Sequence, residues 1–233
     1  MYFPFFGFGY DSTLLLMIGV LILSMIAQGV VRRTFQKYNK VAAGANKSAA
    51  DIARELLRQQ GSMAQLTSVG GELTDHFNPK TNIVGLSEAV YNERSVAALA
   101  VAAHEIGHVM QYEQDYVPIR IRNAILPVAS FSTQAAPLIV IAGLLFSSFN
   151  LAIFGAILYG AMLLFQFVTL PVELDASHRA IEMLQTGGYL SDEEVPQARR
   201  VLRAAAFTYV LAALATLVTF LRLMMFADRT RRR

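Results

Sequence analysis

The 233-residue chain contains no cysteine and few charges, because only 16% of its residues are Asp, Glu, Lys or Arg while 55% are hydrophobic. Without cysteine, neither a disulfide nor a thiolate metal site can form, so any metal must be bound by His, Asp or Glu. Histidine is also scarce, and the four present are His76, His104, His108 and His178. The small charged fraction excludes an ordinary soluble domain of this length and predicts a membrane protein.

The basic residues lie beside apolar segments instead of forming one patch. A net charge of +3 and a pI near 9.3 would also fit a nucleic-acid-binding protein, but that class gathers its Lys and Arg side chains on one face. Flanks of membrane spans explain the distribution better. We therefore expect the lipid bilayer as a partner and no nucleic acid.

Long uncharged runs predict a mainly α-helical membrane protein with about four transmembrane helices. Two such runs hold 18 residues each, and a third, from Ala124 to Val172, holds 49. A bilayer requires about 20 apolar residues, so the longest run, which is interrupted by polar residues 147–150, predicts a hairpin of two spans. The first ten residues include no basic residue, which favours a retained anchor over a cleaved signal peptide. The predicted spans are residues 12–31, 124–146, 151–172 and 204–226.

Two polar segments, 32–123 and 173–203, separate these spans and are predicted to form a zincin-like helical part with a small β hairpin or edge strand. Ser48 and Asp51 mark the start of an amphipathic helix that Gly61 ends. Ser191 and Glu194 form a second capping box. Further helices are predicted over residues 93–112 and 173–187, and we expect one membrane-embedded domain over residues 1–233.

The predicted helix over residues 93–112 carries His104, Glu105 and His108, in the pattern H-E-x-x-H. Histidines four residues apart lie on one face of a helix, so both imidazoles can reach one ion. In this motif the histidines bind zinc, which lowers the pKa of a bound water to about 7, and the glutamate takes up the proton. The alternatives are surface histidines paired with carboxylates, or a structural metal site.

A catalytic zinc site requires a third protein ligand and an open fourth position. Glu173 is the leading candidate, because it is the first charge after 49 uncharged residues. Asp175 and His178 compete with it, and Glu173 can also be an interfacial residue that merely ends a span. Ser177 lies one turn after Glu173 on the same face, which suits a hydrogen-bond partner of a ligand.

Five separated stretches resemble the YugP-like family of membrane zinc metallopeptidases, and together they cover nearly the whole chain. The stretches are DHFNP, GLSEAVY, SVAALAVAAHEIGHVMQ, LPVELDASHRA and ARRVLRAAAFTYV. The family is similar in its active-site plan to the membrane gluzincins, which include the CAAX prenyl proteases and the heat-shock-induced bacterial membrane protease. The resemblance implies His104, His108 and Glu173 as ligands of one Zn²⁺ per chain and Glu105 as general base. Those relatives have an aspartate where this chain has Ser177, so Asp175 is a second candidate for supporting the ligands.

Two further features bear on the substrate. His76 lies in a turn and is a candidate donor to the oxyanion of a tetrahedral intermediate, although a lone histidine in a turn is more often structural. The β-prone run of Asn82, Ile83, Val84, Gly85 and Leu86 is predicted to be an edge strand to which an extended peptide adds by main-chain hydrogen bonds.

Fifteen of the twenty Lys and Arg residues lie in segments 32–123 and 173–203, which the positive-inside tendency places in the cytoplasm. Four spans then put the basic tail after Arg222 on the opposite side, against that tendency. We expect a multi-pass protein of the cell membrane whose active site faces the cytoplasm.

Together these features predict a membrane-anchored zinc endopeptidase that cleaves a polypeptide, membrane-associated or not, with a metal-activated water. A catalytically silent zinc-binding scaffold is one alternative, but it would not need Glu105. An intramembrane-cleaving protease is the other, but Arg94 lies only ten residues before His104, which leaves too short an apolar run to cross a bilayer.

Overall fold

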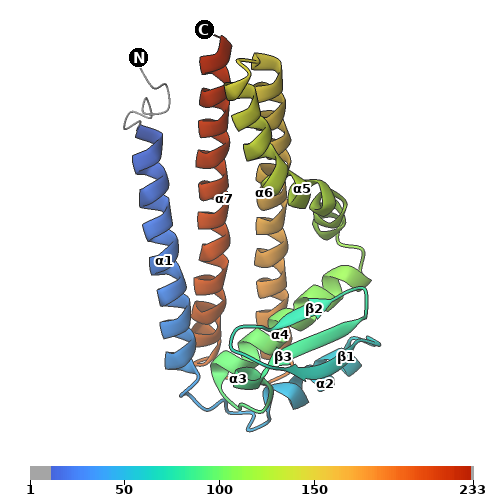
Figure 1. The fold of residues 1–233 in the computed structure, drawn as a ribbon. Coiled ribbons are helices and arrows are strands. Elements are labelled where there is room, and N and C mark those ends of the chain that lie inside the picture. Colours follow the sequence, from blue (N-terminus) through green and yellow to red (C-terminus); the bar gives the residue numbers. More distant parts are fainter. Residues whose placement is uncertain (1–11, 232–233) are drawn as a thin grey trace. The chain divides into compact units, whose positions relative to one another are not determined.

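The computed structural model describes residues 12–231, and most of them are helical (Figure 1). The helices are α1 (Ser12–Tyr38), α2 (Ala49–Gln59), α3 (Glu88–Tyr91), α4 (Val96–Glu113), α5 (Val117–Leu145), α6 (Phe149–Thr186) and α7 (Val195–Arg231). The strands are β1 (Gln65–Val69), β2 (His76–Asn78) and β3 (Ile83–Ser87). The first ten residues, whose lack of basic side chains favoured a retained anchor, lie outside the described residues.

Four of these helices, α1, α5, α6 and α7, are long and apolar enough to cross a membrane, which confirms the predicted fold class. The last two are longer than expected. The helix predicted over residues 173–187 is the continuation of the third span in α6, which passes through Pro171 and then meets no further glycine or proline before its end at Thr186. The helix predicted from Ser191 likewise continues into the fourth span as α7.

Contacts divide the chain into two compact units. Within the described residues, the span unit comprises residues 12–26, 122–168 and 208–231, and the site unit comprises residues 27–121 and 169–207.

Small residues let α5 and the first part of α6 pack closely in the span unit. A Cβ atom on Gly143 would lie 2.4 Å from the backbone nitrogen of Ala152, and one on Gly155 would lie 3.0 Å from the carbonyl oxygen of Ala136. Close backbone approach of this kind is typical of helices that pack in membranes, where burial of apolar surface drives no association between helices. The predicted hairpin is therefore present, with its turn near Ser147, whose φ is +49°.

Helix α4 forms the centre of the site unit. Its side chains Leu99, Ile106 and Val109 are fully buried, and α2 packs against it through Ile52 and Leu56. A helix that is apolar on nearly every side is stable in the interior of a domain. The motif helix therefore owes its apolar composition to this core.

The three-stranded sheet of the site unit has the order β1-β3-β2 (Figure 1). Strand β3 pairs in parallel with β1, as Leu66 opposite Val84 shows, and antiparallel with β2, where Phe77 lies opposite Val84. The predicted strand at Asn82 to Leu86 thus exists as Ile83–Ser87, but the prediction that it is an edge strand was wrong. Because Val84 and Leu86 are fully buried and both sides of β3 are paired, the edges are β1 and β2.

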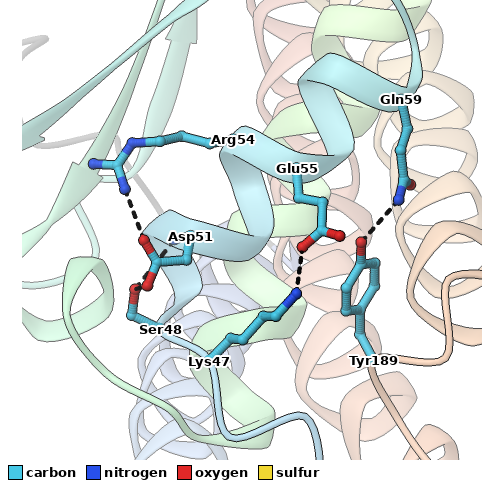
Figure 2. A network of polar contacts seen from close by, with 7 residues as sticks. All are labelled: Lys47, Ser48, Asp51, Arg54, Glu55, Gln59 and Tyr189. Carbon is cyan, nitrogen blue, oxygen red and sulfur yellow. Dashed lines mark hydrogen bonds and ion pairs between the residues drawn. The ribbon is translucent and has the colours of Figure 1, made fainter.

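Helix α2 is held at both ends by polar contacts (Figure 2). The Ser48 hydroxyl accepts the backbone N–H of Asp51, as the capping pattern predicts, and Gly61 follows the helix with a φ of +70°. Lys47 Nζ lies 2.7 Å from Glu55, and Gln59 donates to the Tyr189 hydroxyl at 2.9 Å. The bond from Gln59 to Tyr189 joins α2 to the segment that follows α6.

Candidate metal centre

Helix α4 presents the two histidines of the motif side by side. It begins at Val96, three residues later than predicted, and the hydroxyl of the N-cap residue Ser95 accepts the backbone N–H of Ala98 at 3.1 Å. The rings of His104 and His108 lie one turn apart, with centroids 4.7 Å apart and planes at 83°. The i, i+4 spacing therefore places both imidazoles on one face of the helix.

Glu173 on α6 lies against both imidazoles. Its Oε2 atom is 3.4 Å from Nε2 of His104 and 3.6 Å from Nε2 of His108, and the residue is only 4% exposed. Zinc bonds of about 2.0–2.1 Å at tetrahedral angles separate two ligand atoms by roughly 3.3–3.4 Å. The three side chains therefore fit a zinc ion that retains one open position.

The structure brings Glu173, rather than Asp175 or His178, to the histidines. Among residues 12–231, the group of three side chains that could hold a metal ion consists of His104, His108 and Glu173. The Asp175 carboxylate instead accepts hydrogen bonds from Gln111 and Arg179, and His178 lines a separate cavity. That Glu173 binds the metal remains a prediction, which this geometry favours.

Gly107 allows α4 and α6 to approach closely at this point. A Cβ atom on Gly107 would lie 2.6 Å from the carbonyl oxygen of Ala176 and 3.1 Å from its Cα. Both are backbone atoms of α6, so neither can rotate away. Any side chain at position 107 must separate the two helices, and Ala176 is only three residues from Glu173.

Each histidine has a hydrogen-bond partner on its other ring nitrogen. Nδ1 of His104 lies 3.2 Å from the Ser177 hydroxyl, and Nδ1 of His108 lies 3.0 Å from Oε1 of Gln111. An Nδ1–H that donates to these oxygens leaves Nε2 unprotonated and directed at Glu173, as metal binding requires. That Ser177 supports a metal ligand stays a prediction, which this contact favours.

Gln111, which no sequence pattern singled out, is fully buried. Its amide nitrogen donates to the Val172 carbonyl at 2.7 Å and to Asp175 at 2.8 Å, and Asp175 also accepts from Nε of Arg179 at 2.6 Å. The Asp175 carboxylate is therefore linked to His108 through the side chain of Gln111. The sequence feature that could have identified Gln111 is its position three residues after His108, because i and i+3 side chains are neighbours on a helix.

Glu105 is 8% exposed, and burial raises the pKa of its carboxyl group above the ordinary value, although the neighbouring histidines oppose this. For His108, burial lowers the imidazole pKa, but the nearby Glu173 and Glu105 carboxylates outweigh that effect and the net pKa is raised. A general base works best when its pKa approaches the working pH. The environment of Glu105 therefore suits proton transfer.

His76 lies on strand β2, where its Nδ1 atom is 2.8 Å from the Thr74 carbonyl oxygen. The next residue of this strand, Phe77, contacts Tyr112 of α4 edge to face, with ring centroids 6.1 Å apart. Strand β2 therefore borders the motif helix. The role of His76 as an oxyanion donor stays a prediction.

A family described as "Putative neutral zinc metallopeptidase" matches residues 13–228 of the chain. The chain is also 42% identical over 211 residues to the "Putative membrane protease YugP" of Bacillus subtilis (strain 168), a match that covers 90% of this chain and 94% of that protein. No solved structure matches the chain.

Proposed function

The chain belongs to this family of neutral zinc metallopeptidases, and from that premise we propose that it is a membrane-anchored endopeptidase with one zinc ion held by His104, His108 and Glu173. The spacing of the three ligand atoms, 3.4 and 3.6 Å from Glu173 to the two histidines, is the observation that carries the proposal. Ordinary surface histidines would not share one buried carboxylate.

When bound, zinc polarises a water molecule and the scissile carbonyl group. The carboxylate of Glu105 would accept a proton from the water as its oxygen adds to the scissile carbonyl carbon, and would deliver that proton to the amine nitrogen as the C–N bond breaks. Ser177 and Gln111 keep the two imidazoles in the orientation that Nε2 coordination needs. Because Glu105 and Glu173 are buried, bulk water has little access to their carboxylates and competes little with the metal and the substrate for them.

Because β3 is the central strand, the edge strand β2 is the strand to which we propose that the substrate peptide binds. It pairs with β3 on one side only, and it contacts α4, which carries the motif. An extended peptide that adds to the free side of β2 would form main-chain hydrogen bonds regardless of most side chains. His76 on the same strand is the candidate oxyanion donor.

The distribution of Lys and Arg residues supports a cytoplasmic active site. Within residues 12–231, α4 is not among the helices long and apolar enough to cross a membrane. That favours cleavage beside the bilayer over cleavage within it. The charges after Arg222 are the one feature that opposes the proposed orientation.

Glu105→Gln tests the function most directly. The variant should retain zinc, because its three ligands remain, while casein cleavage should fall by at least about 10²-fold, because glutamine accepts no proton. Metal analysis and a peptidase assay on the purified full chain measure the two effects. Glu113→Gln, at an exposed position of the same helix, is the matched control and should cleave casein normally.

Undiminished cleavage by Glu105→Gln would mean that another group is the base. Loss of activity in the control as well would indicate a general effect of removing a carboxylate from α4. A wild-type chain that binds zinc but cleaves nothing would favour the silent scaffold.

A further inference from the structure

A cavity of about 170 Å³ lies in the site unit between α6 and α7, apart from the group of metal ligands. One part of its lining is polar and is formed by Ser177, His178, Arg199 and Arg203. Aliphatic side chains, among them Ile181 and Leu202, form the rest. No Asp or Glu side chain lines it.

The two arginines give this cavity a concentrated positive charge. Arg199 and Arg203 are one turn apart on α7 and so lie on the same face. Guanidinium groups stay protonated in proteins and match phosphate oxygens with two parallel hydrogen bonds. In the described part of the chain, neither arginine has a carboxylate within 4.0 Å, whereas Arg54 and Arg179 do. The cavity is therefore suited to an anion.

The position of the arginines in α7 indicates the source of that anion. Arg203 directly precedes the uncharged run from Ala204 to Leu221, and α7 is one of the four helices able to cross a membrane. Residues at the end of such a run lie at the level of the lipid headgroups. Basic pockets between membrane helices at this level bind anionic headgroups.

The size and lining of the cavity agree with a headgroup. Pockets for whole small-molecule ligands measure about 300–1,000 Å³, so 170 Å³ suffices only for a small charged group whose remainder lies outside. The aliphatic side chains beside the arginines suit the glycerol and the first methylene groups of a lipid.

We propose that this cavity binds the phosphate headgroup of an anionic phospholipid from the adjacent membrane leaflet. Ser177 lines the cavity, and its hydroxyl also lies 3.2 Å from Nδ1 of His104. A lipid bound here therefore touches a residue that contacts a ligand of the metal centre. The proposal does not depend on catalysis, because lipid binding is measurable without it.

The experiment measures retention of short-chain phosphatidylglycerol by the purified full-length protein in neutral detergent, using native mass spectrometry. The wild type should retain phosphatidylglycerol in preference to phosphatidylcholine. The double variant Arg199→Gln/Arg203→Gln should bind it on the order of 30-fold more weakly, since each arginine near an anionic headgroup accounts for about fivefold. Inorganic phosphate at the same concentration should not displace the lipid.

The matched control is Arg58→Gln/Arg200→Gln, which removes the same charge outside the cavity, Arg200 being engaged with the Tyr38 hydroxyl at 3.0 Å. It should retain phosphatidylglycerol as the wild type does. Zinc content, which should be equal in all three proteins, reports correct folding.

Three results would overturn the proposal. They are equal weakening of binding in both double variants, retention of phosphatidylcholine as strong as that of phosphatidylglycerol, and displacement of the lipid by inorganic phosphate. If the first double variant loses zinc, single variants at Arg199 and Arg203 provide the same comparison.

Discussion

The two units of the chain differ in how far their large apolar side chains are exposed. In the span unit, large apolar side chains point outward, and Phe131, Leu138 and Leu145 are 63%, 68% and 65% exposed. In the site unit, Leu99, Ile106 and Leu184 are fully buried. An outward apolar surface is stable only where the solvent is lipid, whereas buried apolar side chains in water stabilise a core.

The buried polar groups differ in the same way. The span unit buries Ser132 and Thr216, whose hydroxyls bond to carbonyl oxygens of their own helices. The site unit buries the ionisable Glu105 and Glu173 as well as Gln111. Buried carboxylates are costly unless they are paired or bind metal. The ionisable groups that could hold a metal ion therefore lie in the site unit, whose core keeps them in place.

The largest expected effect tests whether the site unit depends on the Glu173 carboxylate. Glu173→Ala leaves two histidines, which bind zinc weakly, so zinc content and peptidase activity should be lost together. Asp175→Ala should retain most of its zinc, because its carboxylate contacts Gln111 and Arg179. Metal analysis of both variants in the same detergent measures this. Full zinc occupancy in Glu173→Ala would refute the ligand assignment.

We expect an intermediate loss of activity when a close contact between two helices is disturbed in the site unit, and none when one is disturbed in the span unit. Gly107→Ala should separate α4 from α6 beside Glu173, and a displacement of about 1 Å can lower activity on the order of 10²-fold. Gly143→Ala introduces an even closer clash, 2.4 Å from the Ala152 nitrogen, but in the span unit. It should lower thermal stability while the protein that remains folded keeps its zinc and activity per bound zinc. Assays of activity per zinc and of unfolding temperature separate the two.

If both glycine variants lost activity per zinc to the same extent, the separation of roles between the units would be wrong.

The smallest effect concerns the hydrogen bonds behind the histidines. Gln111→Ala and Ser177→Ala each remove an Nδ1 partner, and such changes typically weaken metal binding about 10–100-fold. Gln111→Ala should be the more damaging, because it also leaves Asp175 without one of its two donors. Competition with a zinc-binding dye measures the affinity. Thr186→Ala, on the same helix as Ser177 but exposed, should bind zinc normally.

Local patterns accounted for much of the fold. Uncharged runs located all four long apolar helices, and Ser48 caps α2 as expected. The Ser191 backbone N–H donates to Glu194 at 2.8 Å, as in the predicted capping box, but α7 begins only at Val195, four residues after Ser191. The sequence did not predict which strand lies at the centre of the sheet. Strand order depends on how the chain turns between β1, β2 and β3, and the residues of these connections do not specify that path. The short run at Ile83–Ser87 reads the same in either position.

The spacing of the motif alone places two histidines and a glutamate on one turn of a helix, because the period of 3.6 residues is a local property. It required the packing of the folded chain to bring the Glu173 carboxylate beside the two histidines and the Gln111 side chain to His108. Those contacts depend on how closely α4 and α6 approach each other at Gly107 and Ala176, residues 69 positions apart in the chain. No local period encodes such a contact, since packing selects it from every face that a helix can present.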